Sequence, residues 1–395
     1  RMKMKKKIRH RLQEMLEQAI EKEELAGGCL LVRKDGEELL YLEGGMADRE
    51  AGRTISRDQI YRLYSMSKPI TAAAVMKLME EGLVDLAEPV ASYIPAFEGQ
   101  KVEEKGWLVP AARGVTVKDL LDMTSGLTYG GEPGLAGEYA AGLFARVGER
   151  LLSDHPMTTM EFASQAGEGP LLFQPGSSWR YGTSADVLGA VVEAASGMSF
   201  GEYLEKNIFK PLGMKDTGFW VPEKKAERLV KAYQRAENGK LVPYLENHLG
   251  ILNGMDRKPA FESGGAGLVS TVDDYARFAQ MLLNEGELEG VRVLHPATVR
   301  FMTAGSLTAW QEPAFEQNFA NMPGYTYGNL MRVMKYPGHS ATLNRAGEYG
   351  WDGWLGCYFA NDPAEKMTML FMMQKTDSGL TSLVRRMRNL IMSEI

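Results

Sequence analysis

Tyr64-Ser65-Met66-Ser67-Lys68-Pro69 is the stretch that decides how this chain folds and what chemistry it can support. Ser65 and Lys68 are three positions apart, and on a helix this spacing places both side chains on one face. A serine hydroxyl needs a neighbouring base to become a nucleophile near neutral pH, and a desolvated lysine with a lowered pKa can act as that base. The stretch therefore predicts Ser65 as a nucleophile with Lys68 as its partner.

The residues that follow strengthen a pattern that is weak by itself, because a chain of this length holds roughly one or two S-x-x-K matches by chance. Pro69 suits the first turn of a helix, and residues 70–81 form an Ala- and Met-rich segment that ends at Gly82. Ser65 is then placed at a helix N-terminus, where free N–H groups and the helix dipole favour a developing negative charge. The alternative at this point is an ordinary solvated helix start.

The composition indicates a large globular protein. The chain has 395 residues, of which 44% are hydrophobic and 24% charged, and it is long enough for two lobes or one large domain. The net charge is -6, and beyond the extreme N-terminus no basic patch is interleaved with aromatic residues. Both features argue against a nucleic-acid partner.

Cysteine and histidine usage supports neither a disulfide scaffold nor a metal site. Cys29 and Cys357 lie in apolar, strand-like runs and fit small buried residues better than a disulfide. The five histidines show neither an H-E-x-x-H motif nor pairing at i, i+4. We therefore expect no metal and no cofactor.

The N-terminal segment predicts an amphipathic helix. Residues 3–11 are basic, and residues 12–20 place apolar side chains at helical spacing. We expect this helix to pack on a core, with a membrane-surface role as the minor alternative. Neither an apolar signal region nor a run of membrane-spanning length is present, so we expect a cytoplasmic protein without a membrane partner. Arg1 precedes Met2, which leaves open whether an upstream segment has been removed.

Strand-like segments at both ends of the chain enclose a helical middle. We predict an α/β (α+β) fold whose antiparallel sheet is formed by both chain ends and flanked by helices. Residues 1–68 and 212–395 would form the sheet domain and residues 69–211 an inserted all-helical lobe, with the active site at their boundary. The β-prone runs are 27–33, 38–45, 354–360 and 367–374, and the helical patterns are 70–81, 117–124, 159–166, 184–196, 200–208, 271–284 and 378–392.

Two further segments carry chemistry-bearing residues in a definite order. Trp179-Arg180-Tyr181-Gly182-Thr183-Ser184 precedes a small-residue helix, and Gly350-Trp351-Asp352-Gly353-Trp354-Leu355-Gly356 opens a late strand. Together with the first stretch, their order and spacing resemble the serine β-lactamase and penicillin-binding protein superfamily, with class C β-lactamases and family VIII carboxylesterases as the nearest branches. The resemblance covers nearly the whole chain, although each segment alone has a structural explanation as well.

The resemblance implies a β-lactamase-like fold and a site made of three motifs: Ser65 with Lys68, then Tyr181, then the strand at residues 351–354. It implies that Ser65, Lys68 and Tyr181 are the catalytic residues. Ser65 would attack a carbonyl and form an acyl-enzyme, while Tyr181 would act as a phenolate stabilised by Lys68, with a pKa well below its ordinary value. The backbone N–H groups of Ser65 and Trp354 would hold the oxyanion.

Two departures from the family pattern move the expected substrate from β-lactams to esters. Related enzymes often carry Tyr-x-Asn at the second motif, whereas Thr183 offers no amide for a substrate acylamino group. Trp351 stands where β-lactamases present a lysine, and losing that cation removes a contact worth roughly 1.5 to 3 kcal/mol for a substrate carboxylate. Strand alternation places Trp351 and Gly353 on one face and Asp352 on the other, which leaves open whether Asp352 meets substrate.

The prediction is a serine hydrolase, and most specifically a carboxylesterase for small or medium esters. A β-lactamase or D-amino-acid/D-Ala peptidase, an acyltransferase and a non-catalytic binding or assembly protein are the alternatives. The expected partner is a small-molecule ester or amide, and the sequence leaves a homo-oligomer open. An apolar wall for an acyl chain or an aromatic leaving group could be formed by Trp351, Trp354, Tyr129 and Trp220. Core packing is the alternative, and for Tyr129 and Trp220 core or loop packing is the favoured interpretation. The predicted oxyanion and substrate-binding residues are Ser65, Trp351, Gly353, Trp354, Thr183 and Tyr129.

Overall fold

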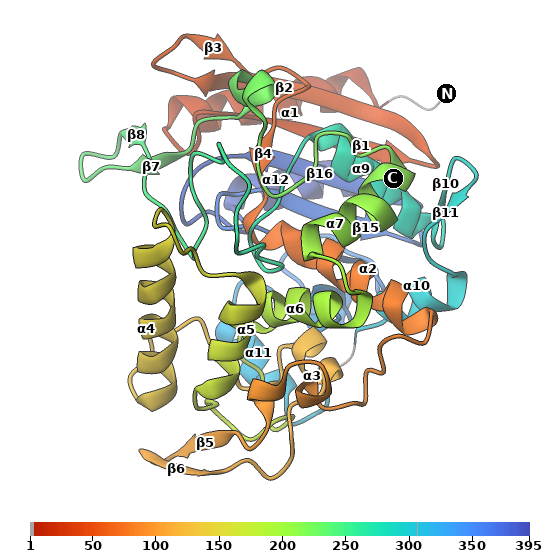
Figure 1. Ribbon diagram of the computed structural model, residues 1–395. Coiled ribbons are helices and arrows are strands. Elements are labelled where there is room, and N and C mark those ends of the chain that lie inside the picture. Colours follow the sequence, from red (N-terminus) through yellow and green to blue (C-terminus); the bar gives the residue numbers. More distant parts are fainter. Residues whose placement is uncertain (1–3, 306) are drawn as a thin grey trace.

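The computed structural model describes residues 4–305 and 307–395, and its centre is one antiparallel sheet with the strand order β12-β13-β14-β15-β16-β1-β2-β3. The first strands of the chain lie beside the last ones, as the red and blue arrows of Figure 1 show. This arrangement confirms the predicted sheet built from both chain ends. Its strands are β1 (Gly27–Lys34), β2 (Glu37–Asp48), β3 (Arg53–Thr54), β12 (Tyr325–Gly328), β13 (Met331–Met334), β14 (Tyr349–Asp352), β15 (Tyr358–Asp362) and β16 (Met367–Met373).

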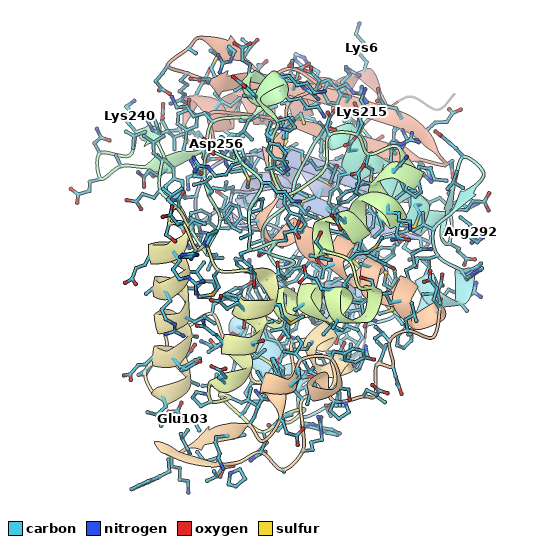
Figure 2. All side chains as sticks on the ribbon, in the orientation of Figure 1. Lys6, Glu103, Lys215, Lys240, Asp256 and Arg292 are labelled. Atoms are coloured by element: carbon cyan, nitrogen blue, oxygen red, sulfur yellow. The ribbon has the colours of Figure 1, made fainter. Side chains whose placement is uncertain are left out.

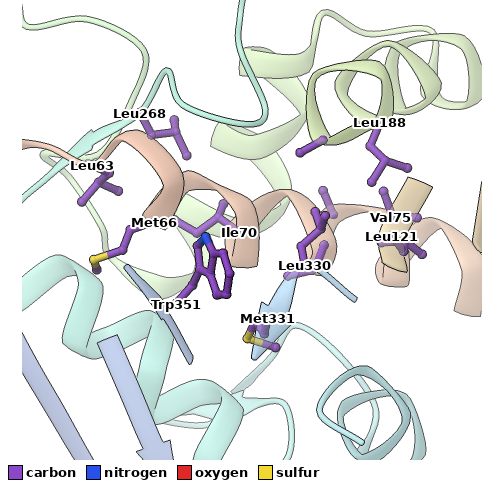
Figure 3. Packing of buried hydrophobic residues seen from close by; sticks show 14 of the residues in the cluster. Leu63, Met66, Ile70, Val75, Leu121, Leu188, Leu268, Leu330, Met331 and Trp351 are labelled. Carbon is purple, nitrogen blue, oxygen red and sulfur yellow. The ribbon is translucent and has the colours of Figure 1, made fainter. Parts of the chain in front are cut away.

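The central strands β1 and β16 are buried on both faces because helices cover both sides of the sheet. Along β1, Leu30 faces one apolar cluster, to which α1 (Lys6–Glu21) and α12 (Ser382–Met392) contribute. Its neighbour Leu31 faces the main cluster, to which α2 (Ser67–Glu80) and α9 (Val272–Leu283) contribute. Figure 3 shows the main cluster, with Met66, Ile70 and Trp351 beside one another along α2.

The segment between α2 and residue 212 has helices as its main regular structure, as predicted, and much of it lies in the lower half of Figure 1. It is not all-helical, because β5 (Lys101–Glu104) and β6 (Trp107–Pro110) form a hairpin. The segment after the glycine-rich connection at 126–137 is a helix that the sequence did not predict, α4 (Leu135–Arg150). The other helices here are α3 (Val117–Asp122), α5 (Thr159–Glu168), α6 (Ser184–Ser196), α7 (Phe200–Leu204) and α8 (Lys210–Leu212), with a π-helical segment at Glu205–Phe209.

The predicted strand at 354–360 is wrong at its start. Residues 353–356 form a tight turn between β14 and β15, closed by a 2.9 Å hydrogen bond from the Gly356 N–H to the Gly353 carbonyl. Gly356 has a φ of +99°, a backbone conformation that is unfavourable for residues with a side chain. Trp354 therefore lies in the turn rather than in the strand, next to the end of β14.

The remaining elements surround this core. Cys29 and Cys357 are both buried and free, as predicted. The division into domains at residues 68/69 and 211/212 stays a prediction, and Arg1 to Lys3 lie outside the described residues. These elements are β4 (Tyr61–Arg62) paired with β9 (Val269–Ser270), β7 (Tyr233–Arg235) with β8 (Leu241–Pro243), β10 (Glu287–Leu288) with β11 (Val291–Arg292), and the helices α10 (Pro296–Met302) and α11 (Glu312–Asn318).

The surface carries many of the charges. Figure 2 shows Lys6, Lys240 and Arg292 pointing outward at the periphery. Among the residues that the structure describes, no helix combines the length and apolar character needed to cross a membrane.

Candidate active site

Ser65 and Trp354 are each the one incompletely buried residue in an otherwise buried stretch. Every residue from Gln59 to Met76 is buried except Ser65, and every residue from Glu348 to Asp362 is buried except Trp354. The two stretches meet, because a Cβ on Gly353 would lie 2.2 Å from the Leu63 carbonyl oxygen. Ser65 and the turn after β14 therefore reach solvent together.

The backbone turns sharply just before Ser65. Tyr64 has a φ of +44°, a left-handed conformation that is strained for a bulky residue and is often found at functional sites. The Tyr64 ring is buried and meets the Trp354 indole edge-to-face, with the ring centroids 5.1 Å apart. A single 3₁₀ turn, Tyr64–Met66, then leads into α2 and sets Ser65 at its start, as the sequence predicted.

Lys68 is fully buried and contacts three oxygen atoms. Its Nζ lies 3.1 Å from Ser65 Oγ, 2.9 Å from the Tyr129 hydroxyl and 2.8 Å from the Gly265 carbonyl oxygen. A neutral amine has two N–H groups and one lone pair, and the carbonyl can only accept a hydrogen bond. If the two N–H groups point to Gly265 and Tyr129, the lone pair points to Ser65 Oγ. The three contacts thus orient Lys68 as a base for the serine proton.

Burial lowers the pKa of Lys68 to about 7, against the opposing effect of the negative charges of Asp186 and Asp352. An ordinary lysine has a pKa of about 10.4 and is charged at neutral pH. Roughly half of the molecules therefore carry the neutral amine at pH 7. This state is the one that can accept a proton from Ser65.

Tyr181 completes the arrangement. Its hydroxyl donates a hydrogen bond of 2.6 Å to Ser65 Oγ and accepts one of 3.0 Å from Trp351 Nε1. Gly182 allows this position, because a Cβ there would lie 2.3 Å from the Leu127 carbonyl oxygen. The three predicted catalytic side chains are thus brought together by α2 and by the loop before α6.

Burial raises the pKa of Tyr181 above its ordinary value, although the hydrogen bonds with Ser65 and Trp351 oppose this effect. The sequence analysis expected the reverse, a phenolate with a lowered pKa. In the free site Tyr181 is therefore a hydrogen-bond donor, and Lys68 is the residue whose pKa lies near neutrality. A phenolate can form only once Lys68, whose Nζ lies 4.5 Å from the Tyr181 ring centroid, has gained a proton.

The proposed oxyanion donors lie where the two buried stretches meet. The ideal Cβ position of Gly353 lies 3.5 Å from the backbone nitrogen of Ser65, so the turn after β14 lies within van der Waals range of this amide. In the part of the chain that the structure describes, neither the Ser65 N–H nor the Trp354 N–H donates to a protein acceptor. Both amides are therefore available for a substrate oxygen, and their role stays a prediction.

The other residues predicted to bind substrate differ in their burial and in their distance from the catalytic side chains. Tyr129 lies in the site, through its contact with Lys68. Trp351 is only 1% exposed and contacts Tyr181, and Thr183 is buried at the N-cap of α6, so neither side chain presents an open surface. Trp220 lines a cavity of about 710 Å³ whose lining includes none of the three catalytic candidates.

Asp352 forms a buried ion pair with an arginine of the neighbouring strand. Its carboxylate lies 2.7 Å from the guanidinium of Arg332 on β13, and both side chains are buried. Arg332 also donates to the Phe359 carbonyl oxygen at 2.9 Å. The strand alternation predicted from the sequence therefore separates Asp352 from Trp351.

Sequence reasoning assigned no role to three groups that the structure places around Lys68 and Tyr181. They are the carbonyl of Gly265, the carboxylate of Asp186 and the indole N–H of Trp351. Gly265 belongs to a glycine-rich segment, and Asp186 follows Tyr181 by five residues. The segment Gly265-Ala266-Gly267-Leu268 contributes to the family resemblance, but only the folded arrangement shows that the Gly265 carbonyl and Asp186 lie near Lys68.

A half-exposed serine, a buried lysine with a lowered pKa and a tyrosine hydroxyl in one hydrogen-bonded group define a serine hydrolase of the S-x-x-K class. The chain belongs to the β-lactamase family, because the family profile described as Beta-lactamase matches residues 12–390.

Relatives of the chain extend over nearly its whole length. Protein Rv1367c of Mycobacterium tuberculosis (strain ATCC 25618 / H37Rv) is 31% identical over 362 residues, which cover 89% of this chain and 86% of that protein. Esterase EstB of Burkholderia gladioli is 31% identical over 386 residues, which cover 94% of this chain and 91% of that protein. These relatives confirm the predicted superfamily.

A solved structure confirms the predicted β-lactamase-like fold. The structure described as EstCE1, a hydrolase with promiscuous acyltransferase activity, has a TM-score of 0.80 and a sequence identity of 26%, and the match covers 97% of this chain and 98% of that one. The protein is therefore a serine hydrolase with a small-molecule substrate.

Proposed function

We propose that the protein is a carboxylesterase that cleaves small or medium uncharged esters through an acyl-enzyme on Ser65. The observation that carries this proposal is the place of Trp351, whose neutral indole N–H contacts Tyr181 at the position where β-lactamases present a cation. Similarity to Esterase EstB supports the same substrate class. A carboxylate-bearing β-lactam would find no charge-assisted contact from this residue.

The acylation step follows from the hydrogen bonds of the free site. Ser65 Oγ bonds to the ester carbonyl carbon while its proton passes to the neutral amine of Lys68. The oxyanion that forms is held by the N–H groups of Ser65 and Trp354. When the tetrahedral intermediate collapses, Tyr181 donates its proton to the leaving alkoxide, which departs as an alcohol. The acyl-enzyme then contains a charged Lys68 beside the Tyr181 phenolate.

Deacylation reverses these proton transfers, with water in place of the alcohol. The Tyr181 phenolate takes a proton from water as the hydroxide bonds to the acyl carbon, and charged Lys68 returns a proton to Ser65 Oγ as the acid leaves. The Trp351 N–H, 3.0 Å from the Tyr181 oxygen, stabilises the phenolate between the two steps. The protein thus ends the cycle in its starting protonation state.

The aromatic surroundings of the site suit an apolar substrate group. The Trp354 indole stacks on His248 with the ring centroids 4.0 Å apart, and its Nε1 donates to Asp377 at 2.8 Å. On the other side, the Tyr129 ring packs edge-to-face on Tyr181. Rigid aromatic walls of this kind favour an acyl chain or an aromatic leaving group over a charged one.

The test is hydrolysis of p-nitrophenyl acetate and butyrate by the wild-type protein and by Ser65→Ala. We expect hydrolysis that is lost in the variant, together with an intact-mass increase that corresponds to one acyl group on wild-type protein. A chromogenic cephalosporin and a D-alanyl peptide, assayed in parallel, distinguish the β-lactamase and peptidase alternatives. Full ester hydrolysis by Ser65→Ala would contradict the assignment of the nucleophile.

An acyltransferase is the second candidate, because the acyl-enzyme can pass its acyl group to an alcohol instead of water. The similarity to EstCE1, whose description includes promiscuous acyltransferase activity, favours testing it. Addition of a primary alcohol to the ester assay separates the two outcomes, since transfer yields a new ester while hydrolysis yields the acid.

A further inference from the structure

Asp186 is a buried carboxylate in the first turn of α6, with an exposed fraction of 3%. It accepts a hydrogen bond of 3.0 Å from the Gly265 N–H and another from the Ser263 hydroxyl. Both partners lie on the segment that precedes β9, so Asp186 connects α6 to that segment. Within the described ranges, no ion pair involves Asp186. The nearby charge that affects the pKa of Asp186 is that of Lys68.

The backbone of Gly265 links Asp186 to Lys68. Its N–H points to Asp186, while its carbonyl oxygen, in the next peptide group, lies 2.8 Å from Lys68 Nζ. The N–H of that next peptide group, which belongs to Ala266, donates at 3.0 Å to the Ser263 hydroxyl that itself donates to Asp186. The space around this peptide is small: a Cβ on Gly264 would lie 2.5 Å from the Ala185 carbonyl oxygen, and one on Gly265 would lie 3.1 Å from Asp186 Oδ1. Gly265 is therefore held against α6, and the peptide groups on both sides of it depend on Asp186, one directly and one through Ser263.

The elements around Lys68 supply two carboxylates, Asp186 from α6 and Asp352 from β14. The hydroxyls of Ser65, Tyr129 and Tyr181 face it as well. The carboxylate of Asp352 is largely compensated by its ion pair with the buried guanidinium of Arg332 on β13. In the portion of the chain described, Asp186 accepts hydrogen bonds but contacts no arginine or lysine side chain.

We propose that Asp186 is a positioning residue for Lys68: it fixes the backbone of Gly265, directly at the N–H and through Ser263 at the carbonyl that receives one Lys68 N–H, and it thereby directs the Lys68 lone pair to Ser65 Oγ. This role rests on the proposed function, in which Lys68 accepts the serine proton. Asp186 touches neither the nucleophile nor the substrate, so it acts through the Gly265 carbonyl.

The charge of Asp186 has a second effect of defined sign. A nearby negative charge favours the charged form of Lys68, which opposes the effect of burial on the Lys68 pKa. Removing the charge while keeping an acceptor should therefore make Lys68 lose its proton at lower pH. Activity that needs the neutral amine should then persist to lower pH than in the wild-type protein.

The test uses two variants and a matched control. Asp186→Asn keeps an oxygen that can accept from Gly265 but removes the charge, whereas Asp186→Ala removes both. Asp274→Asn is the control, because Asp274 is 4% exposed and accepts in the same way from a backbone N–H, that of Asp216, and from a hydroxyl, that of Thr217, without contact to Lys68. Each variant is assayed for kcat/KM against pH with p-nitrophenyl butyrate and for the rate of Ser65 labelling by a fluorophosphonate.

We expect Asp186→Asn to move the acidic limb of both pH profiles to lower pH by about one pH unit. We expect Asp186→Ala to lower the plateau rate by about 10- to 100-fold, since the Gly265 peptide is released and the lysine is no longer directed. The control should follow the wild-type profile. Fluorophosphonate labelling needs no ester substrate. If the labelling profile shifts to lower pH but no ester is hydrolysed, the positioning role of Asp186 is supported and only the proposed ester substrate is rejected.

Unchanged midpoints and rates in Asp186→Asn would overturn the proposal, as would an equal shift in the control. If both Asp186 variants fail to fold, Ser263→Ala decides, because it removes the hydroxyl that connects Asp186 to the Ala266 N–H, in the peptide group that carries the Gly265 carbonyl. A lowered plateau rate in this variant supports the proposal, and a wild-type plateau rate contradicts it.

Discussion

Trp351 Nε1 donates a hydrogen bond of 3.0 Å to the Tyr181 hydroxyl, and this hydroxyl donates one of 2.6 Å to Ser65 Oγ. The third motif therefore contacts the catalytic tyrosine through the neutral N–H of Trp351 and does not present a cation to the substrate. This contact explains how the chain can keep the covalent serine chemistry of its family while it loses the family's carboxylate contact.

Trp351→Phe should lower kcat because it removes this hydrogen bond and keeps an aromatic ring. One neutral hydrogen bond is worth about 1 kcal/mol, which corresponds to a decrease of about 5- to 10-fold. The measurement is steady-state hydrolysis of p-nitrophenyl butyrate, with thermal unfolding to check that the variant is folded.

Trp179→Phe is the matched control for that variant. Trp179 also stacks on Tyr181, with the ring centroids 6.2 Å apart, but its indole N–H has no hydrogen-bond partner among the described residues. We expect it to keep kcat within about twofold of wild type. Equal losses in the two variants would show that packing, and not the hydrogen bond, explains the effect.

Gly353→Ala should greatly reduce acylation, because the new Cβ would lie 2.2 Å from the Leu63 carbonyl oxygen. Relief of this clash should move the turn after β14 away from Ser65 and separate the two proposed oxyanion donors, since the loss of one such donor costs about 100-fold or more in comparable sites. Fluorophosphonate labelling of Ser65 measures this step directly. Gly148→Ala on α4, where a Cβ meets no atom within 4 Å, is the control and should label at the wild-type rate.

Much of this fold could be predicted because strong local signals agreed with the long-range arrangement. The β-prone runs at 27–33 and 38–45 predicted β1 and β2, and Pro69 with the following Ala-rich segment predicted α2. The turn at 353–356 was mistaken for a strand because Trp354 and Leu355 are β-prone while the glycines that bend the chain act through contacts distant in sequence. Similarly, the pKa of Tyr181 depends on burial, which the spacing of motifs does not reveal.

Asp352→Asn should destabilise the fold, because it leaves the guanidinium of Arg332 without a carboxylate in a place where Arg332 is 1% exposed. Removal of one partner of a buried ion pair costs about 3–5 kcal/mol. Chemical denaturation measures the free energy of unfolding. The double variant Arg332→Leu/Asp352→Asn should recover part of the loss, since the unpaired charge is then gone. A double variant less stable than the single one would contradict this account.

Lys68→Met should change the stability of the protein in a pH-dependent manner. Lys68 has a pKa of about 7 in the folded protein and an ordinary value of 10.5, so between these pH values the unfolded chain binds more protons than the folded one. Stability of the wild type then rises with pH through this interval, and the cost of burying the charge is fully present below about pH 7. Each pKa unit corresponds to about 1.4 kcal/mol, so the effect is on the order of a few kcal/mol.

The measurement is the free energy of unfolding of wild type and Lys68→Met at pH 6 and at pH 10. Methionine leaves the Gly265 carbonyl and the Tyr129 hydroxyl without a partner, a cost that is equal at both pH values. The difference between the two proteins should therefore shift in favour of Lys68→Met at pH 6 compared with pH 10. Lys210→Met, on an exposed lysine, controls for the loss of one positive charge. A stability difference that is the same at both pH values would exclude a buried lysine that titrates near neutrality.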